Sequence, residues 1–155
     1  MKITTLPLIF LSIDDDGMHI MVQGLINGLP ANFIVDTGAS RSVFDQVGIK
    51  KYIPDLTLEE NEKLSTGLGT NSMPSHVTVI ESITLGQLVI GDYSAILIDL
   101  THVHQSYQAL QLPEINGVLG GDLLWKYRAA INYKTQTLKL SYAYKSDAYL
   151  DAIFL

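Results

Sequence analysis

Residues 33–40 read Phe33-Ile34-Val35-Asp36-Thr37-Gly38-Ala39-Ser40. The aromatic and β-branched residues 33–35 predict a buried strand, and Asp36 stands where that strand ends. Gly38 permits a backbone path that a residue with a Cβ would resist. A carboxylate beside an apolar strand is poorly solvated, which favours its protonated form and suits acid–base chemistry. Asp and Gly are also common in the ordinary turn that follows a strand. The stretch alone therefore leaves a structural and a catalytic interpretation open.

A second stretch later in the chain belongs with the first, and it reads Gly117-Val118-Leu119-Gly120-Gly121-Asp122-Leu123-Leu124. The first stretch resembles the active-site loop of the aspartic peptidases. The second resembles the apolar-apolar-Gly segment, followed by a short helix, that closes a retropepsin-type lobe. The resemblance covers roughly residues 18–140. It implies an all-β, retropepsin-like closed barrel lobe with one or two short helices.

The resemblance also assigns roles to residues of the two stretches. Asp36 is the catalytic acid/base, the Thr37 hydroxyl bonds across a two-fold axis, and Gly38 lets its N–H approach the carboxylate. Ala39 stands where pepsin-like lobes often carry Ser, so one donor is missing and the pKa of the carboxyl should be less depressed. The remaining members of the implied site are Ser40 in the loop and the supporting residues Val118, Leu119 and Gly120.

Length and composition limit the classes of protein to which the chain can belong. The 155 residues predict one domain, 1–155, and the 47% hydrophobic and 17% charged residues are typical of a globular chain. The net charge of -6 comes without a basic block, which argues against a nucleic-acid partner. Since the sequence has no cysteine, disulfides, thiolate zinc sites and cysteine nucleophiles are excluded. We expect no cofactor.

The N-terminal stretch 1–13 has a basic residue and then an apolar run. A short signal peptide is one interpretation. Three acids follow at 14–16 without a small-x-small cleavage site, and the apolar run is too short to span a bilayer. We therefore expect a first strand over 6–13 and a cytoplasmic protein, with the signal peptide as the alternative.

The pattern of short strands predicts a barrel. Strands are expected over 18–26 and 31–35, joined by a type I′ turn at Asn27-Gly28. Further hairpins are expected over 82–90 and 129–142, with a turn at Gly91-Asp92 and a buried strand over 95–98. Short helices are expected over 40–49, and over 123–127 with Asp122 as the cap.

The stretch 63–74 is rich in Gly, Ser and Thr, with Gly67, Leu68 and Gly69 at its centre. It looks like the tip of a mobile hairpin, which in retropepsins is the flap that covers a bound peptide. A plain hairpin loop is the alternative. A phosphate-binding loop is a poor alternative, because no Gly-Lys-Ser/Thr follows.

His102 and His104 are two residues apart, and on a strand they would share a face. Two histidines without a third His or an acid make a weak metal site, so we expect no metal. A metal- or ligand-binding barrel remains a minor interpretation that rests on this pair alone.

Aspartic-peptidase chemistry needs two neighbouring carboxylates that share one proton. The chain has a single Asp-Thr-Gly, and neither Asp99 nor Asp122 stands in that context. The second carboxylate must then be Asp36 of another copy, as in the homodimeric retropepsins. The resemblance thus implies an aspartic endopeptidase with a peptide or protein substrate. The alternative is a catalytically silent, retropepsin-like peptide-binding or scaffold module.

The sequence departs from the compact retroviral pattern by an apparent insertion over 41–61 and an extra tail over 143–155. It looks closer to the bacterial retropepsin-like proteins. The apolar end of the tail, Ile153-Phe154-Leu155, is expected to help hold the dimer.

Overall fold

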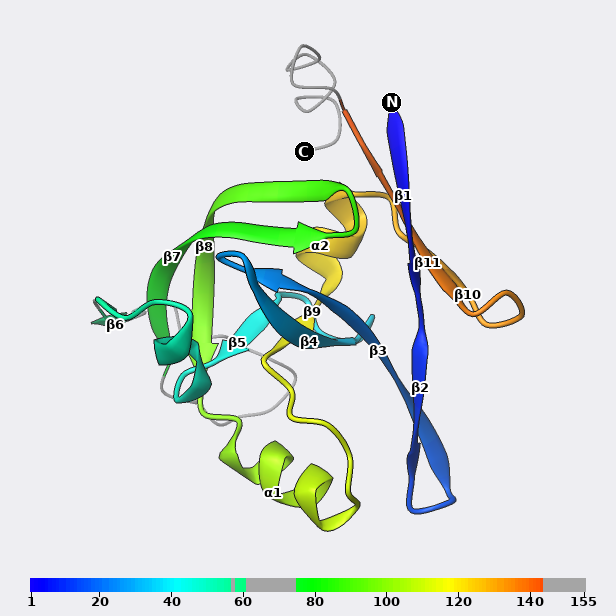
Figure 1. Ribbon diagram of the computed structural model, residues 1–155, viewed down its shortest axis with the longest axis horizontal. Helices are drawn as coiled ribbons and strands as arrows, with labels where there is room; N and C mark the ends of the chain where they lie inside the picture. Colours follow the sequence, from blue (N-terminus) through cyan, green and yellow to red (C-terminus); the bar gives the residue numbers. More distant parts are fainter. Residues whose placement is uncertain (57, 61–74, 144–155) are drawn as a thin grey trace.

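The computed structural model describes residues 1–56, 58–60 and 75–143, and its centre is a closed β-barrel (Figure 1). Six strands neighbour one another in the order β3, β4, β9, β5, β8 and β7, and pairing of β3 with β7 closes the ring. Their bounds are Gly17–Ile26 (β3), Leu29–Val35 (β4), Gly117–Leu119 (β9), Val43–Asp45 (β5), Leu88–Ile98 (β8) and His76–Leu85 (β7). The predicted all-β closed barrel is confirmed.

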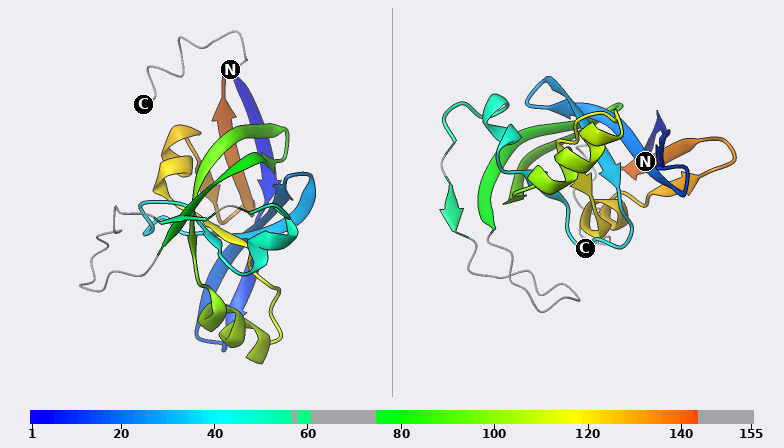
Figure 2. Two further views of the ribbon diagram at one scale, coloured as in Figure 1. Left: turned by 90° about the vertical axis from the view of Figure 1, so that its left-hand side faces the viewer. Right: turned by 90° about the horizontal axis from the view of Figure 1, so that it is seen from below.

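Further strands extend or flank the barrel. β2 (Ile9–Ile13) pairs with β3, and β6 (Glu59–Glu60) pairs with β7. A separate sheet joins β1 (Lys2–Pro7), β11 (Thr137–Tyr142) and β10 (Ala130–Asn132), in that order. The described residues also form the helices α1 (Thr101–Ala109) and α2 (Gly121–Lys126) and the 3₁₀ turn η1 (Gly48–Lys51). Figure 2 shows α1 at the end of the molecule away from the N-terminus.

The barrel interior is filled by large apolar side chains from alternate strand positions, as the two-residue period of a strand requires. The rings of Phe33 and Phe44 meet edge to face at 6.2 Å between their centroids. A smaller cluster lies between the β2–β3 hairpin and α1, and its buried members are Leu11, Met21, Tyr107 and Ile115. This second cluster anchors α1 beside the barrel.

The predicted hairpin at Asn27-Gly28 is confirmed. Both residues have positive φ, 48° and 81°, as a type I′ turn demands. The Asn27 amide also ties the turn to the neighbouring strand, because its Oδ1 accepts the N–H of Ser82 at 3.0 Å. The hairpin therefore sets the register that delivers Asp36 at the end of β4.

Two predictions near the N-terminal half are wrong. The single strand over 6–13 is two strands interrupted at Leu8, because β1 pairs with β11 whereas β2 pairs with β3. The helix over 40–49 is instead β5 followed by η1, because Phe44 pairs with Leu97 on β8 and with Gly117 on β9. The apparent insertion over 41–61 thus contributes a strand of the closed barrel.

Two predictions in the second half are also wrong. Gly91 and Asp92 do not form a turn but lie inside β8, where Asp92 adopts a φ of 47°. His102 and His104 lie on α1 rather than on a strand. The hairpin of β10 and β11 is confirmed. The predicted flap at Gly67, Leu68 and Gly69 and most of the tail lie outside the described residues.

Candidate active site

The two stretches that the sequence analysis paired lie side by side. β4 and β9 run parallel, with Ile34 opposite Val118 and Val35 opposite Leu119. At the point where β4 ends, the backbone N–H of Asp36 donates to the carbonyl of Leu119 at 3.0 Å. Asp36 is therefore held at its backbone by the Val118-Leu119-Gly120 segment.

The Asp36 loop, residues 36–40, is a tight turn around the carboxylate. The N–H of Gly38 donates to Asp36 Oδ1 at 2.9 Å, and the N–H of Ala39 donates to the carbonyl of Asp36 at 3.3 Å. Asp36 and Thr37 are exposed in the single chain. The expectation that Asp36 is poorly solvated is therefore wrong for one copy, because the loop lies at the rim of the barrel.

The start of α2 is hydrogen-bonded to the backbone of the Asp36 loop. The N–H groups of Gly121 and Asp122 donate to the carbonyls of Ala39 (2.7 Å) and Ser40 (3.1 Å). A Cβ at Gly120 would lie 2.6 Å from the carbonyl oxygen of Arg41 and 2.8 Å from that of Ala39. Only a glycine lets the two backbones approach this closely.

Asp122 has a different role from the predicted helix cap. Gly120 is the N-cap residue of α2, and the Asp122 carboxylate points back toward the Asp36 loop. Its Oδ1 accepts both the N–H and the Oγ–H of Ser42 at 2.7 Å. Ser42 Oγ in turn accepts the N–H of Gly120 at 2.9 Å. Nothing in the sequence pattern had singled out Ser42, since its partners are distant in the chain.

The second oxygen of Asp122 accepts the hydroxyl of Tyr93 at 2.6 Å, and Arg41 Nε lies 3.9 Å away. Burial raises the pKa of Tyr93, and the hydrogen bond and negative charge of Asp122 raise it further. Tyr93 therefore keeps its proton and remains a donor. The four side chains of Arg41, Ser42, Tyr93 and Asp122 form what we call the loop anchor.

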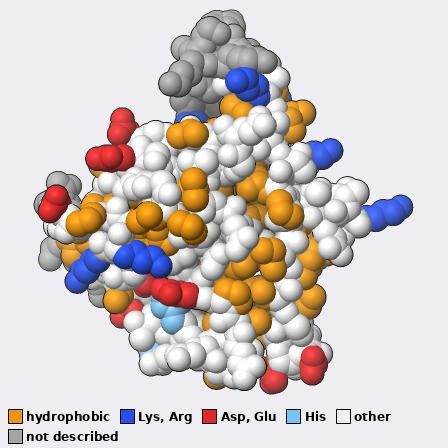
Figure 3. All heavy atoms as spheres, in the orientation of Figure 1, with side chains coloured by type: hydrophobic (Ala, Val, Ile, Leu, Met, Phe, Trp, Pro, Cys, Tyr) orange, Lys and Arg blue, Asp and Glu red, His pale blue; other side chains and the backbone are white. Residues whose placement is uncertain are grey.

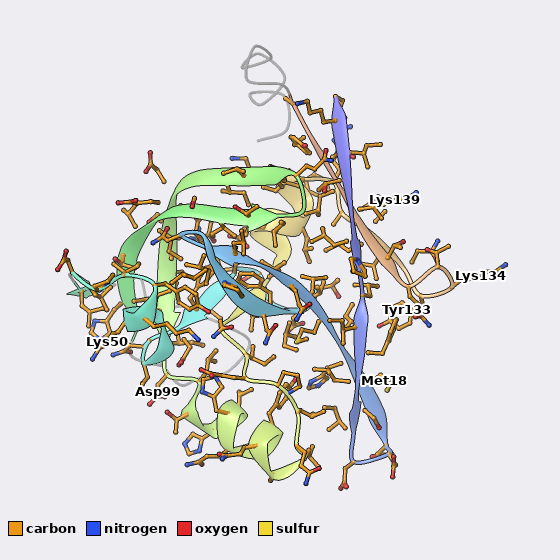
Figure 4. The ribbon with its side chains drawn as sticks, viewed as in Figure 1. Met18, Lys50, Asp99, Tyr133, Lys134 and Lys139 are labelled. Carbon is orange, nitrogen blue, oxygen red and sulfur yellow. The ribbon has the colours of Figure 1, made fainter. Side chains whose placement is uncertain are left out.

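An apolar groove of about 570 Å³ opens beside Asp36 and Thr37. One wall comes from β3 and β4, and the opposite wall comes from Leu100, α1 and Ile115. Met18 and Tyr133, which are labelled in Figure 4, also line the groove and are 54% and 61% exposed. Hydrophobic side chains gather over β2 and β3 on the face shown in Figure 3. The groove places an apolar surface directly against the candidate acid.

A buried acid and a histidine fasten α1, which forms a wall of the groove. Asp45 is 2% exposed and accepts the N–H groups of Gly48 (2.7 Å) and Leu100 (3.3 Å). His104 Nδ1 lies 3.9 Å from the Asp45 carboxylate, and its Nε2–H donates to the carbonyl of Ile115 at 2.6 Å. Both ring nitrogens of His104 thus have structural partners. Within the described ranges no group of three His, Cys, Asp or Glu residues could hold a metal ion.

The sequence of residues 22–123 matches the family described as aspartyl protease. This chain belongs to the aspartyl protease family. The matched span contains Asp36, the loop anchor and the Val118-Leu119-Gly120 segment. No curated protein matches the chain.

Solved structures place this aspartyl protease family member in the retropepsin-like fold. A retropepsin-like aspartic protease from Rickettsia conorii is similar at a TM-score of 0.54 and 19% identity, over 90% of this chain and 91% of that one. The retroviral protease-like domain of Ddi1 from Leishmania major is similar at a TM-score of 0.52 and 14% identity, over 83% of this chain and 97% of that one. The predicted aspartic peptidase family and the predicted retropepsin-like fold are therefore confirmed. None of the described helices is long and apolar enough to cross a membrane.

Proposed function

We propose that this chain is an aspartic endopeptidase that works as a homodimer, with one Asp-Thr-Gly from each copy. The observation that carries the proposal is the placement of Asp36. Its backbone is fixed by Leu119, its carboxylate accepts the N–H of Gly38, and the residue is exposed at the edge of an apolar groove. A second copy can therefore bring its own Asp36 to the same point.

In this proposal the two Asp36 carboxylates share one proton, because like charges about 3 Å apart cannot both ionise. The ionised carboxylate takes a proton from a water molecule, whose oxygen attacks the peptide carbonyl carbon. The protonated carboxylate donates its proton to the carbonyl oxygen, which gives a neutral gem-diol. When the C–N bond breaks, the carboxylate that took the water proton passes it to the leaving nitrogen, and the other carboxylate takes a proton from a gem-diol hydroxyl, so that the products are an amine and a carboxylic acid. The Thr37 hydroxyl bonds across the two-fold axis. Asp122 is not available as the second acid, since Ser42 and Tyr93 occupy its oxygens.

The substrate is an extended peptide, and the groove takes one of its side chains. Apolar residues line most of the groove, and pockets of this kind bury the larger part of a bound side chain. The chain's net charge of -6 and the Asp36 carboxylate favour peptides that are not strongly acidic.

Mixed dimers test the need for two copies of Asp36. Wild-type chain is mixed with Asp36→Asn chain, and cleavage of a pooled peptide library is followed by mass spectrometry. If each site needs two aspartates and the chains exchange freely, a ninefold excess of the variant should leave about a tenth of the wild-type activity. The same excess of Asp92→Asn chain is the control, because Asp92 is exposed on β8 and should pair productively.

Dilution provides the second arm. Specific activity should fall when the protein concentration drops below the dissociation constant of the dimer. Light scattering on the same dilution series should show monomers at those concentrations. Full specific activity in a strictly monomeric sample, or activity untouched by excess Asp36→Asn chain, would refute the two-copy site. A stable dimer that cleaves no peptide between acidic and neutral pH would favour the peptide-binding or scaffold module.

A further inference from the structure

His19 on β3 and Tyr107 on α1 form a polar pair in the wall of the groove. The Tyr107 hydroxyl is hydrogen-bonded to His19 Nδ1, and the two ring centroids are 5.9 Å apart. Tyr107 is 5% exposed, whereas His19 is an exposed residue. Because Tyr107 engages Nδ1 and His19 lines the groove, Nε2 is the ring nitrogen left for a ligand in a groove whose other lining is mostly apolar.

The buried hydroxyl determines which atom carries the imidazole hydrogen. Burial raises the pKa of Tyr107, so its hydroxyl keeps the hydrogen. A buried O–H without an acceptor is costly, and His19 Nδ1 is the acceptor that the described residues provide. In the neutral ring Nδ1 then accepts, and the hydrogen resides on Nε2. A protonated ring also carries hydrogen on Nε2, so this atom is a donor in both states.

We propose that His19 is a specificity-determining residue and that the groove selects a glutamine side chain of the substrate. The glutamine stem packs against apolar groove residues such as Ile34 and Val103, and its side-chain carbonyl accepts the Nε2–H of His19. The amide NH₂ keeps contact with water because His19 is exposed. Glutamate has the same length, but its charge is disfavoured by Asp36 and by the net charge of -6. This inference rests on the proposed function, since it concerns the same groove.

Methionine is the matched apolar probe, because it has about the length of glutamine and lacks the acceptor. Octapeptide pools are made with Gln or Met fixed at each position in turn. Binding is measured by fluorescence anisotropy on the Asp36→Asn chain, and cleavage is measured on the wild-type chain. At the position that enters the groove, Gln should be preferred over Met by about fivefold, the effect of one neutral hydrogen bond.

Three variants separate the hydrogen bond from packing. His19→Phe should remove the Gln preference and leave Met peptides bound at least as well. Tyr107→Phe should reduce the preference, because Nδ1 then competes with Nε2 for the hydrogen. Val103→Ala is the control, since it removes apolar contact and should weaken Gln and Met peptides alike. Nitrogen-15 NMR of the His19 ring should show the Nε2–H form in the wild-type chain and a mixture of tautomers in Tyr107→Phe.

The outcomes distinguish the two proposals. A Gln preference in binding that depends on His19, without any cleavage, sinks the peptidase assignment and supports the inference. Cleavage with equal use of Gln and Met, or a Gln preference that survives His19→Phe, overturns the inference and leaves the peptidase standing. Equal loss of Gln and Met peptides in His19→Phe also overturns it, because His19 would then contact the peptide backbone. Absence of binding by every pool overturns it as well.

Discussion

Ser42 and Asp122 meet through two hydrogen bonds that end on one oxygen. Asp122 Oδ1 accepts both the N–H and the Oγ–H of Ser42, each at 2.7 Å, and Ser42 is completely buried. Ser42 follows the Asp36 loop and Asp122 lies in the first turn of α2. The position of Asp36 therefore depends on a contact that none of the loop residues makes.

Asp122→Asn should destabilise the protein by about 1–3 kcal/mol, because charge-assisted hydrogen bonds from Ser42 and Tyr93 become weaker neutral ones. Urea unfolding followed by circular dichroism measures the change. Asp92→Asn is the matched control, since it removes the same charge from an exposed position on the same strand as Tyr93 and should shift stability by less than about 0.5 kcal/mol. Equal stability of the two variants would count against the anchoring role of Asp122.

Gly120→Ala should cost about 2–3 kcal/mol and impair cleavage, because its Cβ would lie 2.6 Å from the Arg41 carbonyl oxygen and push the Asp36 loop away. These neighbours are backbone carbonyl oxygens, which cannot move aside by a change of rotamer as a side chain could. Gly17→Ala is the control: no atom lies within 4 Å of a Cβ there, and the change should be nearly neutral. Thermal unfolding and activity assays on both variants check this prediction. A Gly120→Ala chain as stable and as active as Gly17→Ala would contradict the tight packing.

Stability should decline as pH rises above about 10, the ordinary pKa of an unfolded tyrosine. Burial and Asp122 raise the pKa of Tyr93 in the folded state, so unfolding releases a proton in that range. Tyr93→Phe should be less stable at neutral pH, because Asp122 loses a donor, and its stability should fall less steeply above pH 10. Urea midpoints from pH 7 to 11 measure both effects. Tyr133→Phe, at an exposed phenol, is the control. The same slope in Tyr93→Phe and wild type would rule out this origin of the decline.

Asp36→Asn should lower the rate of cleavage by about a thousandfold or more, while leaving the free energy of unfolding within about 0.5 kcal/mol of wild type. The residue is exposed, and an asparagine oxygen can still accept the N–H of Gly38. The variant thus keeps the turn and loses the base. Peptide cleavage and urea unfolding are measured on the same preparation. Undiminished cleavage would remove Asp36 from the chemistry, and a failure to fold would show that it is structural.

Local chemistry explains the features that the sequence predicts well. Asn27-Gly28 accepts positive φ at both positions, so the hairpin and the strand that leads to Asp36 follow from two adjacent residues. The pattern of short strands and turns predicts an all-β barrel, and the resemblance of the Asp-Thr-Gly and Val-Leu-Gly stretches to the aspartic peptidases implies that it is retropepsin-like. These are the elements for which propensity and tertiary structure agree.

Several of the wrong predictions share a different cause, which is pairing with partners far along the chain. Val43, Phe44 and Val47 have helical spacing, yet Phe44 is drawn into a strand between β8 and β9. Asp122 has the composition and place of a helix cap, yet Ser42 offers it two donors. His19 and Tyr107 meet across the molecule, and no local pattern connects them. Periodicity and capping rules describe neighbours in sequence and are silent on such contacts.

The pairing of β1 with β11 has a consequence for biosynthesis. Lys2 lies opposite Tyr142 and Pro7 opposite Thr137, so β1 leaves the ribosome long before β11, the strand with which it pairs. The strand that carries Asp36 likewise waits for β9. At about 5–20 residues per second, these edges stay unpaired for seconds while the chain grows, and unpaired edges are where nascent β-proteins associate wrongly. A chain stalled before Gly117 would carry the Asp-Thr-Gly sequence without the strand that fixes it, so no fragment that ends before Gly117 can possess the site.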